Sequence, residues 1–360
     1  MTLYKRTNLI IHDYFENFGG GERLVKILHQ TKKFDLVYCF KKIDIIKKFK
    51  LTKNSLSLNN SIFPTFFKKI FIKKIFEKYL VNTKYKKIIF SGNYSIFAKT
   101  NNNCKKIFYC HSLPKLFFYF DKFYSRKNLF LFLINRLFKK KFKKEYIKKL
   151  KKMDMILCNS EYTKREIKKK TNLNAKVIYP PIELDKFKWI SQKKYFVSNN
   201  RHVIGKNNHI IINAFKNFPN IDIYFTSTGP QNIFLKKIAK GYKNIKFTGL
   251  LNEKRYAKLI GNSSATINIS NFEDFGMAAL EGLSAGKPSI VINESGYLET
   301  IKSNYNGFVI NKNKIDIELY NFLKEIDYNK LNKMRGNCEK SVRKFSSLYF
   351  IRNILSCLNV

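Results

Sequence analysis

The stretch S-N-F-E-D-F-G-M-A-A-L-E-G-L-S-A-G-K-P-S-I-V-I, residues 270–292, decides the fold of this chain. An apolar run at 265–269 leads into it, and a helix rich in small residues is predicted from about Gly276. Gly286 and Pro288 end that helix, and a second apolar run follows at 289–292. Strand, loop, helix and strand in this order form the repeating unit of a parallel sheet. The stretch therefore predicts an α/β fold.

Two glutamates flank the start of the predicted helix. Glu273 lies at the carboxyl end of a strand, where parallel sheets bind ligands, and Glu281 follows after seven intervening residues. The helix N-terminus offers unsatisfied backbone amides that suit a phosphate, those of Phe275, Gly276, Met277 and Ala278. One loop could thus hold a sugar, a diphosphate and a nucleoside. From the two acids alone, a capping carboxylate and a solvated helical glutamate are the alternative.

As a whole block, the stretch resembles the signature of family-4 (group 1) retaining glycosyltransferases of the GT-B fold. That signature has Glu, seven residues and Glu, with F-G between them and A-G-x-P after them. The resemblance implies two Rossmann-like domains that face a central cleft. The second domain would bind a sugar nucleotide, and the first would present the acceptor. The likeness extends over almost the whole chain and is weakest at 41–85 and 115–150.

The first half of the chain carries two further motifs of this family, which includes mannosyltransferases. G-G-G-E-R-L at 19–24 opens a helix after a predicted strand, and the resemblance implies that Gly20 and Gly21 face the donor's diphosphate and sugar. His111 follows another predicted strand in C-H-S-L-P. In the family a histidine in this context contacts the transferred sugar. Leu113, between the serine and the proline, is a departure from the family's pattern.

The second half carries the family's pattern of Arg, four residues and Lys, which Arg201 and Lys206 match. Two fixed cations suit the negative charge that builds on a departing nucleoside diphosphate as the glycosidic bond breaks. Two surface bases in a Lys-rich chain are the alternative. A later turn has Ser227 and Thr228 where a second glycine is usual, so the contact with the base is open there.

Buried runs predict the strands of both domains, at 7–12, 35–40, 87–91, 106–110, 154–158, 195–198, 221–226, 245–248, 265–269 and 289–292. The paired prolines Pro180 and Pro181 favour a domain boundary nearby. We therefore expect an N-terminal acceptor-side domain at 1–188 and a C-terminal nucleotide-sugar-binding domain at 189–344. The resemblance implies that a final amphipathic helix at 345–360 crosses back to the first domain.

The net charge of +45 is extreme, and residues 1–188 carry +32 of it, from 45 Lys/Arg and 13 Asp/Glu. Such a field favours anionic partners. Residues 115–152 have 14 Lys/Arg and two acids among aromatic residues, as in basic helices that lie on membrane surfaces. A solvated helix face is the alternative, and codon bias toward Lys is another source of charge. No nucleic-acid-binding motif accompanies the charge, so nucleic acid is not an expected partner.

The sequence also predicts where the protein acts. The six cysteines form no C-x-x-C pair, which favours buried, reduced thiols in a cytosolic protein. No signal peptide is visible, and the apolar run at 129–138 is too short to span a bilayer. We expect a cytoplasmic protein, peripheral on the inner face of an anionic membrane.

The expected reaction is retaining transfer of a hexose from a sugar nucleotide, with GDP-mannose as the leading donor, to a glycan acceptor. The acceptor would be polyprenyl- or otherwise lipid-linked, in polysaccharide or glycolipid biosynthesis. A UDP-sugar-dependent glucosyl- or N-acetylhexosaminyltransferase is one alternative, and a non-catalytic basic module is another. Glu273 and Glu281 oppose the latter, because carboxylates repel phosphates. No cofactor or metal is expected, since Arg201 and Lys206 can supply the positive charge.

Overall fold

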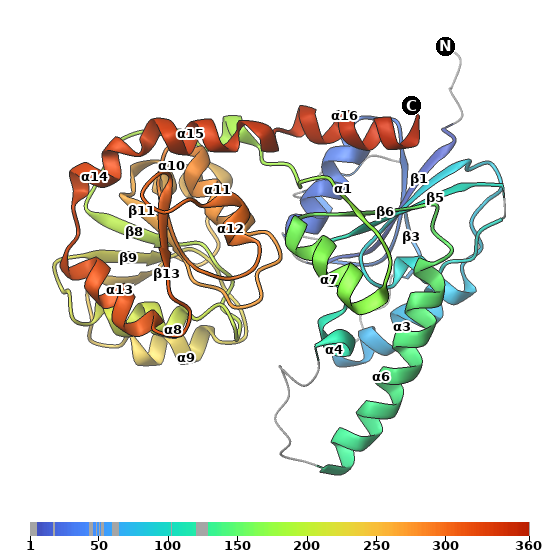
Figure 1. Cartoon of the computed structure of the whole chain (residues 1–360), viewed down its shortest axis with the longest axis horizontal. Coiled ribbons are helices and arrows are strands. Elements are labelled where there is room, and N and C mark those ends of the chain that lie inside the picture. Colours follow the sequence, from blue (N-terminus) through green and yellow to red (C-terminus); the bar gives the residue numbers. More distant parts are fainter. Residues whose placement is uncertain are drawn as a thin grey trace. The chain divides into compact units, whose positions relative to one another are not determined.

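The computed structural model describes residues 6–16, 19–42, 46–47, 49, 51, 54–59, 65–101, 103–119 and 129–359. The chain divides into two compact units. Unit 1 comprises the chain up to Pro180 and again from Phe350, and unit 2 comprises Pro181–Tyr349. Figure 1 shows the elements of both units. The division falls between the paired prolines, somewhat before the expected boundary at residue 188.

Unit 1 is built from parallel strands joined by helices. Its strands are β1 (Asn8–Phe15), β2 (Asp35–Lys41), β3 (Ser55–Ser57), β4 (Lys87–Ser91), β5 (Lys105–Cys110), β6 (Met155–Cys158) and β7 (Lys176–Val177). Its helices are α1 (Gly20–Gln30), α3 (Thr65–Lys78), the 3-10 turn η1 (Ser95–Phe97), α4 (Lys115–Phe118), α6 (Leu129–Leu150), α7 (Glu161–Thr171) and most of α16 (Ser347–Leu358).

The strands of unit 1 lie in the order β3-β2-β1-β4-β5-β6-β7, and every neighbouring pair is parallel. Alternate side chains of the strands enter two separate apolar clusters. One cluster includes residues of α1 and α16, and the other includes residues of α3, α6 and α7. Helices therefore cover both faces of the sheet, as the buried strands require.

Unit 2 repeats this architecture. Its strands are β8 (Tyr195–Ser198), β9 (Asp222–Phe225), β10 (Ile245–Phe247), β11 (Ala265–Asn268), β12 (Ser289–Ile292) and β13 (Gly307–Ile310). Its helices are η2 (Leu184–Lys186), α8 (Asn208–Phe215), α9 (Asn232–Ile238), α10 (Glu253–Asn262), α11 (Met277–Ser284), α12 (Tyr297–Thr300), α13 (Ile315–Lys324), α14 (Tyr328–Lys333), α15 (Arg335–Val342) and η3 (Arg343–Phe345).

Strand order in unit 2 is β10-β9-β8-β11-β12-β13, again with parallel neighbours. The order reverses direction between β8 and β11, and in unit 1 it reverses between β1 and β4. In open parallel sheets, the loops at the carboxyl ends of such a strand pair diverge and leave a ligand crevice. Each sheet therefore has one place where a site is expected.

The described elements confirm the strands that the apolar runs predict, with ends that differ by at most a few residues. The short strands β3, β7 and β13 were not predicted. At the start of α7, Ser160 Oγ accepts a hydrogen bond from Thr163 N at 3.0 Å and caps the helix. All six cysteines are buried and unpaired with one another.

The basic region predicted at 115–152 is only partly visible, because residues 120–128 and the side chains of 129–138 lie outside the described part. In the rest of α6, Phe142 and Tyr146 are buried in the core, whereas Lys140, Lys141 and Lys144 are exposed. No helix in the described part of the chain combines the length and the apolar character of a membrane span.

Trp189, the sole tryptophan of the chain, anchors the first segment of unit 2. The Lys287 ammonium lies over its ring, 4.9 Å from the centroid, and the Arg335 guanidinium lies 4.3 Å from it. Lys287 is 1% exposed and donates to the Ser191 carbonyl. Cations over an indole ring are attracted by its π electrons, so these contacts hold the segment against α15 and the turn that follows α11.

Candidate active site

Two loops meet where the strand order of unit 2 reverses. The loop after β8 carries Arg201 and Lys206, and the loop after the adjacent strand β11 carries Glu273. Asn271 N donates to Gly205 O at 2.7 Å, and Asn207 Nδ2 donates to Ile269 O at 2.8 Å. These hydrogen bonds fix one loop against the other. The predicted cationic pair and the predicted carboxylate thus belong to one rigid arrangement.

Lys206 and Glu273 form an ion pair, with Nζ and Oε2 separated by 2.5 Å. The other oxygen of Glu273, Oε1, accepts a hydrogen bond from Gly276 N at 3.3 Å. One carboxylate therefore contacts both the lysine and the N-terminus of α11. These are the two groups that the sequence assigned to the donor's diphosphate. A phosphate can take the place of the Glu273 carboxylate here. Lys206 and the N-terminus of α11 then still have an anionic partner.

The backbone before α11 is fixed by close packing. Gly276 has φ +90°, and a Cβ there would lie 2.7 Å from the ring of Tyr297, so only glycine fits. Phe275 is 2% exposed and packs edge-on against Phe345, with ring centroids 5.4 Å apart. Gly296 N donates to Glu273 O at 2.9 Å. The amides that were predicted to bind phosphate are thus held in place, and α11 begins at Met277.

Arg201 lies in the same loop as Lys206, but its side chain is exposed. In the described part of the chain its guanidinium forms no ion pair, whereas its carbonyl accepts from Asn208 Nδ2 at 3.2 Å. The adjacent His202 is buried, and its Nδ1 lies 2.9 Å from Asn232 Oδ1. The backbone of the arginine is therefore anchored while its charge faces solvent.

Glu281 lies on α11, and only 5% of it is exposed. Its Oε2 accepts hydrogen bonds from Asn199 Nδ2, at 2.9 Å, and from the Tyr256 hydroxyl. Asn199 directly follows β8 and Tyr256 belongs to α10, so residues from three parts of unit 2 meet at this carboxylate. It is a structurally fixed group, not the solvated helical glutamate of the alternative interpretation.

In unit 1, the structure brings together two of the predicted residues. A Cβ on Gly21 would lie 3.4 Å from Cε1 and Nε2 of His111, so the first turn of α1, which begins at Gly20, packs against this ring. Ser91 Oγ lies 2.8 Å from His111 Nε2. Burial lowers the pKa of His111 to about 4, so the ring is neutral at pH 7. Asn159 Nδ2 donates to the His111 carbonyl at 2.7 Å.

Sequence reasoning missed several residues that support these groups. Asn199 and Tyr256 orient Glu281, and Ser91 contacts His111. Asn199 and Ser91 each follow or end a strand at its carboxyl end, a position that could have marked them. Tyr256 lies within an ordinary amphipathic helix, and nothing local distinguishes it.

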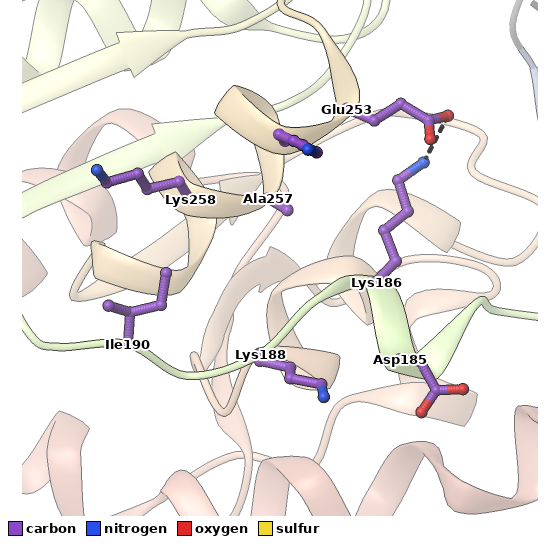
Figure 2. Close-up of a pocket in the computed structure, with 8 residues that line it drawn as sticks. Asp185, Lys186, Lys188, Ile190, Glu253, Ala257 and Lys258 are labelled. Carbon is purple, nitrogen blue, oxygen red and sulfur yellow. Dashed lines mark ion pairs between the residues drawn. The ribbon is translucent and has the colours of Figure 1, made fainter.

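A surface pocket of about 410 Å³ lies between the segment that follows η2 and helix α10. Figure 2 shows Lys186 and Glu253 at its side, where they form an ion pair at 3.0 Å. None of the predicted site residues lines it. The described residues contain no group of three or more His, Cys, Asp or Glu side chains arranged to hold a metal ion.

Residues 181–344 match the family described as glycosyl transferases group 1. The match spans almost all of unit 2, with both loops of the site. These residues are therefore similar to a group 1 glycosyl transferase domain. The chain is accordingly a glycosyltransferase, as the sequence predicted.

Among curated proteins, the glycosyltransferase is 28% identical to alpha-1,3/1,6-mannosyltransferase ALG2 of Dictyostelium discoideum, over 71% of this chain and 70% of that one. It is 26% identical to the uncharacterized glycosyltransferase MJ1178 of Methanocaldococcus jannaschii, over 54% of this chain and 56% of that protein.

Solved structures share the fold of this glycosyltransferase. Anabaena Alr3699/HepE, solved in complex with UDP and glucose, matches with a TM-score of 0.75 at 14% identity, over 98% of this chain and 99% of that one. Sucrose-phosphate synthase from Thermosynechococcus elongatus matches with a TM-score of 0.76 at 11% identity, over 98% of both chains. The predicted GT-B fold, with two parallel α/β sheets, is confirmed.

Proposed function

We propose that this glycosyltransferase moves a hexose from a nucleoside-diphosphate sugar to a glycan acceptor with retention of configuration. The observation that carries the proposal is the joined pair of loops in unit 2, which puts Lys206, Glu273 and the N-terminus of α11 in contact. Mannose from GDP-mannose is the proposed donor group, because one relative is named a mannosyltransferase. A lipid-linked glycan, such as a polyprenyl-linked one, is the proposed acceptor.

The proposed division of roles follows the chemistry of each group. Arg201, Lys206 and the amides before α11 would bind the diphosphate and stabilise the charge that develops on it. Glu273 would hold hydroxyls of the transferred sugar, and Glu281 would bind the ribose. From unit 1, His111 would contact the transferred sugar, and Gly20 and Gly21 would lie near the diphosphate.

In the proposed reaction, the bond between C1 of the sugar and the phosphate oxygen breaks. The acceptor oxygen forms a new bond to C1 on the same face, and its proton passes to the departing phosphate oxygen. No enzyme nucleophile is needed, and no cofactor or metal is proposed. Arg201 and Lys206 supply the positive charge that a metal would otherwise provide.

A UDP-sugar donor is the second candidate, and it would make the enzyme a glucosyl- or N-acetylhexosaminyltransferase. Its support is the fold shared with HepE, whose structure was solved with UDP and glucose. The turn at Ser227 and Thr228, expected near the base, lacks the usual second glycine and favours neither donor.

The test combines ligand binding with turnover. We expect GDP-mannose to raise the melting temperature of the full chain more than UDP-hexoses do, and we expect RNA and DNA to have no comparable effect. Arg201→Ala or Lys206→Ala should lower turnover by about 10²–10³, because each removes a cation from the developing charge. Lys240→Ala, at an exposed site in unit 2, is the matched control. Stabilisation by nucleic acid alone, or normal turnover in both site variants, would overturn the proposal.

A further inference from the structure

The Ser91 hydroxyl, at the carboxyl end of β4, lies between the ring of His12 within β1 and the ring of His111 directly after β5. Its Oγ is 3.0 Å from His12 Nδ1 and 2.8 Å from His111 Nε2. Ser91 is fully buried and His12 is 4% exposed. The two rings meet edge to face, with centroids 6.4 Å apart. Hydrogen bonds thus link His111, the proposed sugar contact, to a buried second histidine.

The position of Ser91 is fixed by the next residues of the chain. Gly92 turns the backbone at φ +101°, and a Cβ there would lie 2.4 Å from the carboxyl carbon of Asp13. The Asp13 carboxylate accepts hydrogen bonds from the backbone amides of Asn93, Tyr94 and Ser95, at 2.6, 2.9 and 2.8 Å. These hydrogen bonds join β1 to the turn that follows β4, where the strand order reverses. Ser91 directly precedes this turn and is therefore held in place.

A serine hydroxyl has a single proton, which it can donate to one ring nitrogen while it accepts from another. If Ser91 donates to His111 Nε2, it must accept from His12 Nδ1, and the proton of His111 then lies on Nδ1. If it donates to His12 Nδ1 instead, Nε2 of His111 carries the proton. Each neutral ring therefore determines the tautomer of the other.

The edge of His111 that remains for a ligand is the Nδ1 edge. Nε2 contacts Ser91, and the first turn of α1 packs on that side of the ring at Gly21. Among the described residues, no hydrogen bond partner faces Nδ1. The tautomer decides whether Nδ1 donates to a ligand oxygen or accepts from a hydroxyl, so it decides what this edge can recognise.

We propose that Ser91 and His12 are positioning residues that hold His111 in one neutral tautomer. Burial lowers the pKa of His12 to about 3, with nearby His111 adding to the effect, and burial lowers that of His111 to about 4. Both rings are therefore neutral at pH 7, as the coupling requires. The consequence for sugar recognition rests on the proposed function, whereas the coupling itself does not.

The coupling can be read from nitrogen NMR of the full chain with ¹⁵N-labelled histidine, since each tautomer has its own pattern of ring shifts. His12 presents Nδ1 to Ser91 and His111 presents Nε2. Because one of these nitrogens donates and the other accepts, the two rings must be in the same tautomer. We expect both to be Nδ1–H or both to be Nε2–H. Opposite tautomers, or a charged ring at pH 7, would overturn the proposal.

Ser91→Ala supplies the second arm. We expect His111 to lose its single tautomer and the two rings to become independent. His29 is the internal reference, because its Nδ1 lies 3.2 Å from the Phe34 carbonyl and its signals should not change. Ser91→Thr, which keeps the hydroxyl, should show the matched tautomers again. If the alanine variant fails to fold, the tautomers of the wild type by themselves decide the proposal. Unchanged His111 signals in Ser91→Ala would sink the idea.

Turnover connects this coupling to catalysis. We expect Ser91→Ala to lower kcat about tenfold to a hundredfold with little change in donor KM. The variant disturbs how His111 is held and leaves the affinity for the donor unchanged. Ser91→Thr should recover most of kcat. An unchanged kcat in the alanine variant would contradict a positioning role. If the wild type transfers no sugar at all, the proposed function fails, while matched tautomers would still establish the coupling.

Discussion

The Glu273 carboxylate contacts two groups that belong to the proposed phosphate site. It pairs with Lys206 and accepts from the first amide before α11. A diphosphate that binds there must displace the carboxylate from both. The freed glutamate would then be available to the sugar hydroxyls. The ion pair thus competes with the proposed donor and also joins the two loops of the site.

This competition gives opposite expectations for the two glutamates. Glu273→Gln should abolish most transfer, yet keep or strengthen the affinity for a free nucleoside diphosphate, because Lys206 loses its competing charge. Glu281→Gln should weaken nucleotide affinity, since it alters the proposed ribose contact. Titration calorimetry with GDP and UDP measures both effects. Equal losses of affinity in the two variants would show that the roles are divided wrongly.

At this scale, the sequence predicted residues but not their contacts. The spacing of Glu273 from Glu281, and of Arg201 from Lys206, was visible because each pair lies within one short stretch of the chain. The pairing of Lys206 with Glu273 depends on strands β8 and β11 being neighbours, which no local pattern encodes. The same holds for His12 and Ser91, which are 79 residues apart.

At the scale of elements, α6 shows how charge and packing divide along one helix. In its described second half the aromatic side chains, Phe142 and Tyr146, are buried in the core. The exposed face carries lysines and no apolar anchor: Lys140, Lys141, Lys144 and Lys148. Any membrane contact of this half would therefore be electrostatic. Salt alone should then reverse it, because exposed charges are screened beyond roughly 8 Å at physiological ionic strength.

We propose that this face docks on anionic lipid on the cytoplasmic side of a membrane, which vesicle sedimentation can test. Replacement of its four lysines by Gln should release the protein from acidic vesicles, since each lysine near the surface contributes about 1 kcal/mol. Activity on a short, soluble acceptor should survive. The matched control replaces four exposed lysines of unit 2, Lys236, Lys237, Lys240 and Lys243. If the wild type ignores acidic vesicles at low salt, the face is merely solvated.

The sequence predicted the strands whose burial produces an apolar run, and it missed the strands that have no such run. The strands in the middle of each sheet are continuous apolar runs, because helices cover both of their faces. β3 and β7 lie at the two edges of the unit 1 sheet and have only three and two residues. Ser55–Ser57 and Lys176–Val177 contain no apolar run. These two segments are strands because they pair with β2 and β6, and their own composition does not predict them.

At the scale of the whole molecule, stability should depend on pH through the buried groups of unit 1. The unfolded chain protonates its histidines below about pH 6.5, whereas folded His111 and His12 stay neutral down to about pH 4 and pH 3. Their contribution is full above pH 6.5 and is lost as the pH falls. Asp13 opposes this, because burial raises its pKa from 3.8 to about 6, so its contribution grows as the pH falls.

The two histidines outweigh the one aspartate, so we expect unit 1 to lose about 2 kcal/mol of stability between pH 7 and pH 5. Urea unfolding at several pH values measures this. His12→Gln should flatten the dependence, because it removes one of the buried rings whose pKa is lowered. His209→Gln, on α8 of unit 2, is the control and should leave it unchanged. A dependence of the same size in His12→Gln would refute the assignment.

Since unit 1 contains no tryptophan, Trp189 gives the chain a built-in optical probe of one half only. Its indole emission, excited where tyrosine does not absorb, reports the surroundings that Lys287 and Arg335 create, and therefore reports unit 2. Circular dichroism, in contrast, follows the helices of both units. The difference between the two signals would separate the melting of unit 1 from that of unit 2 without any label.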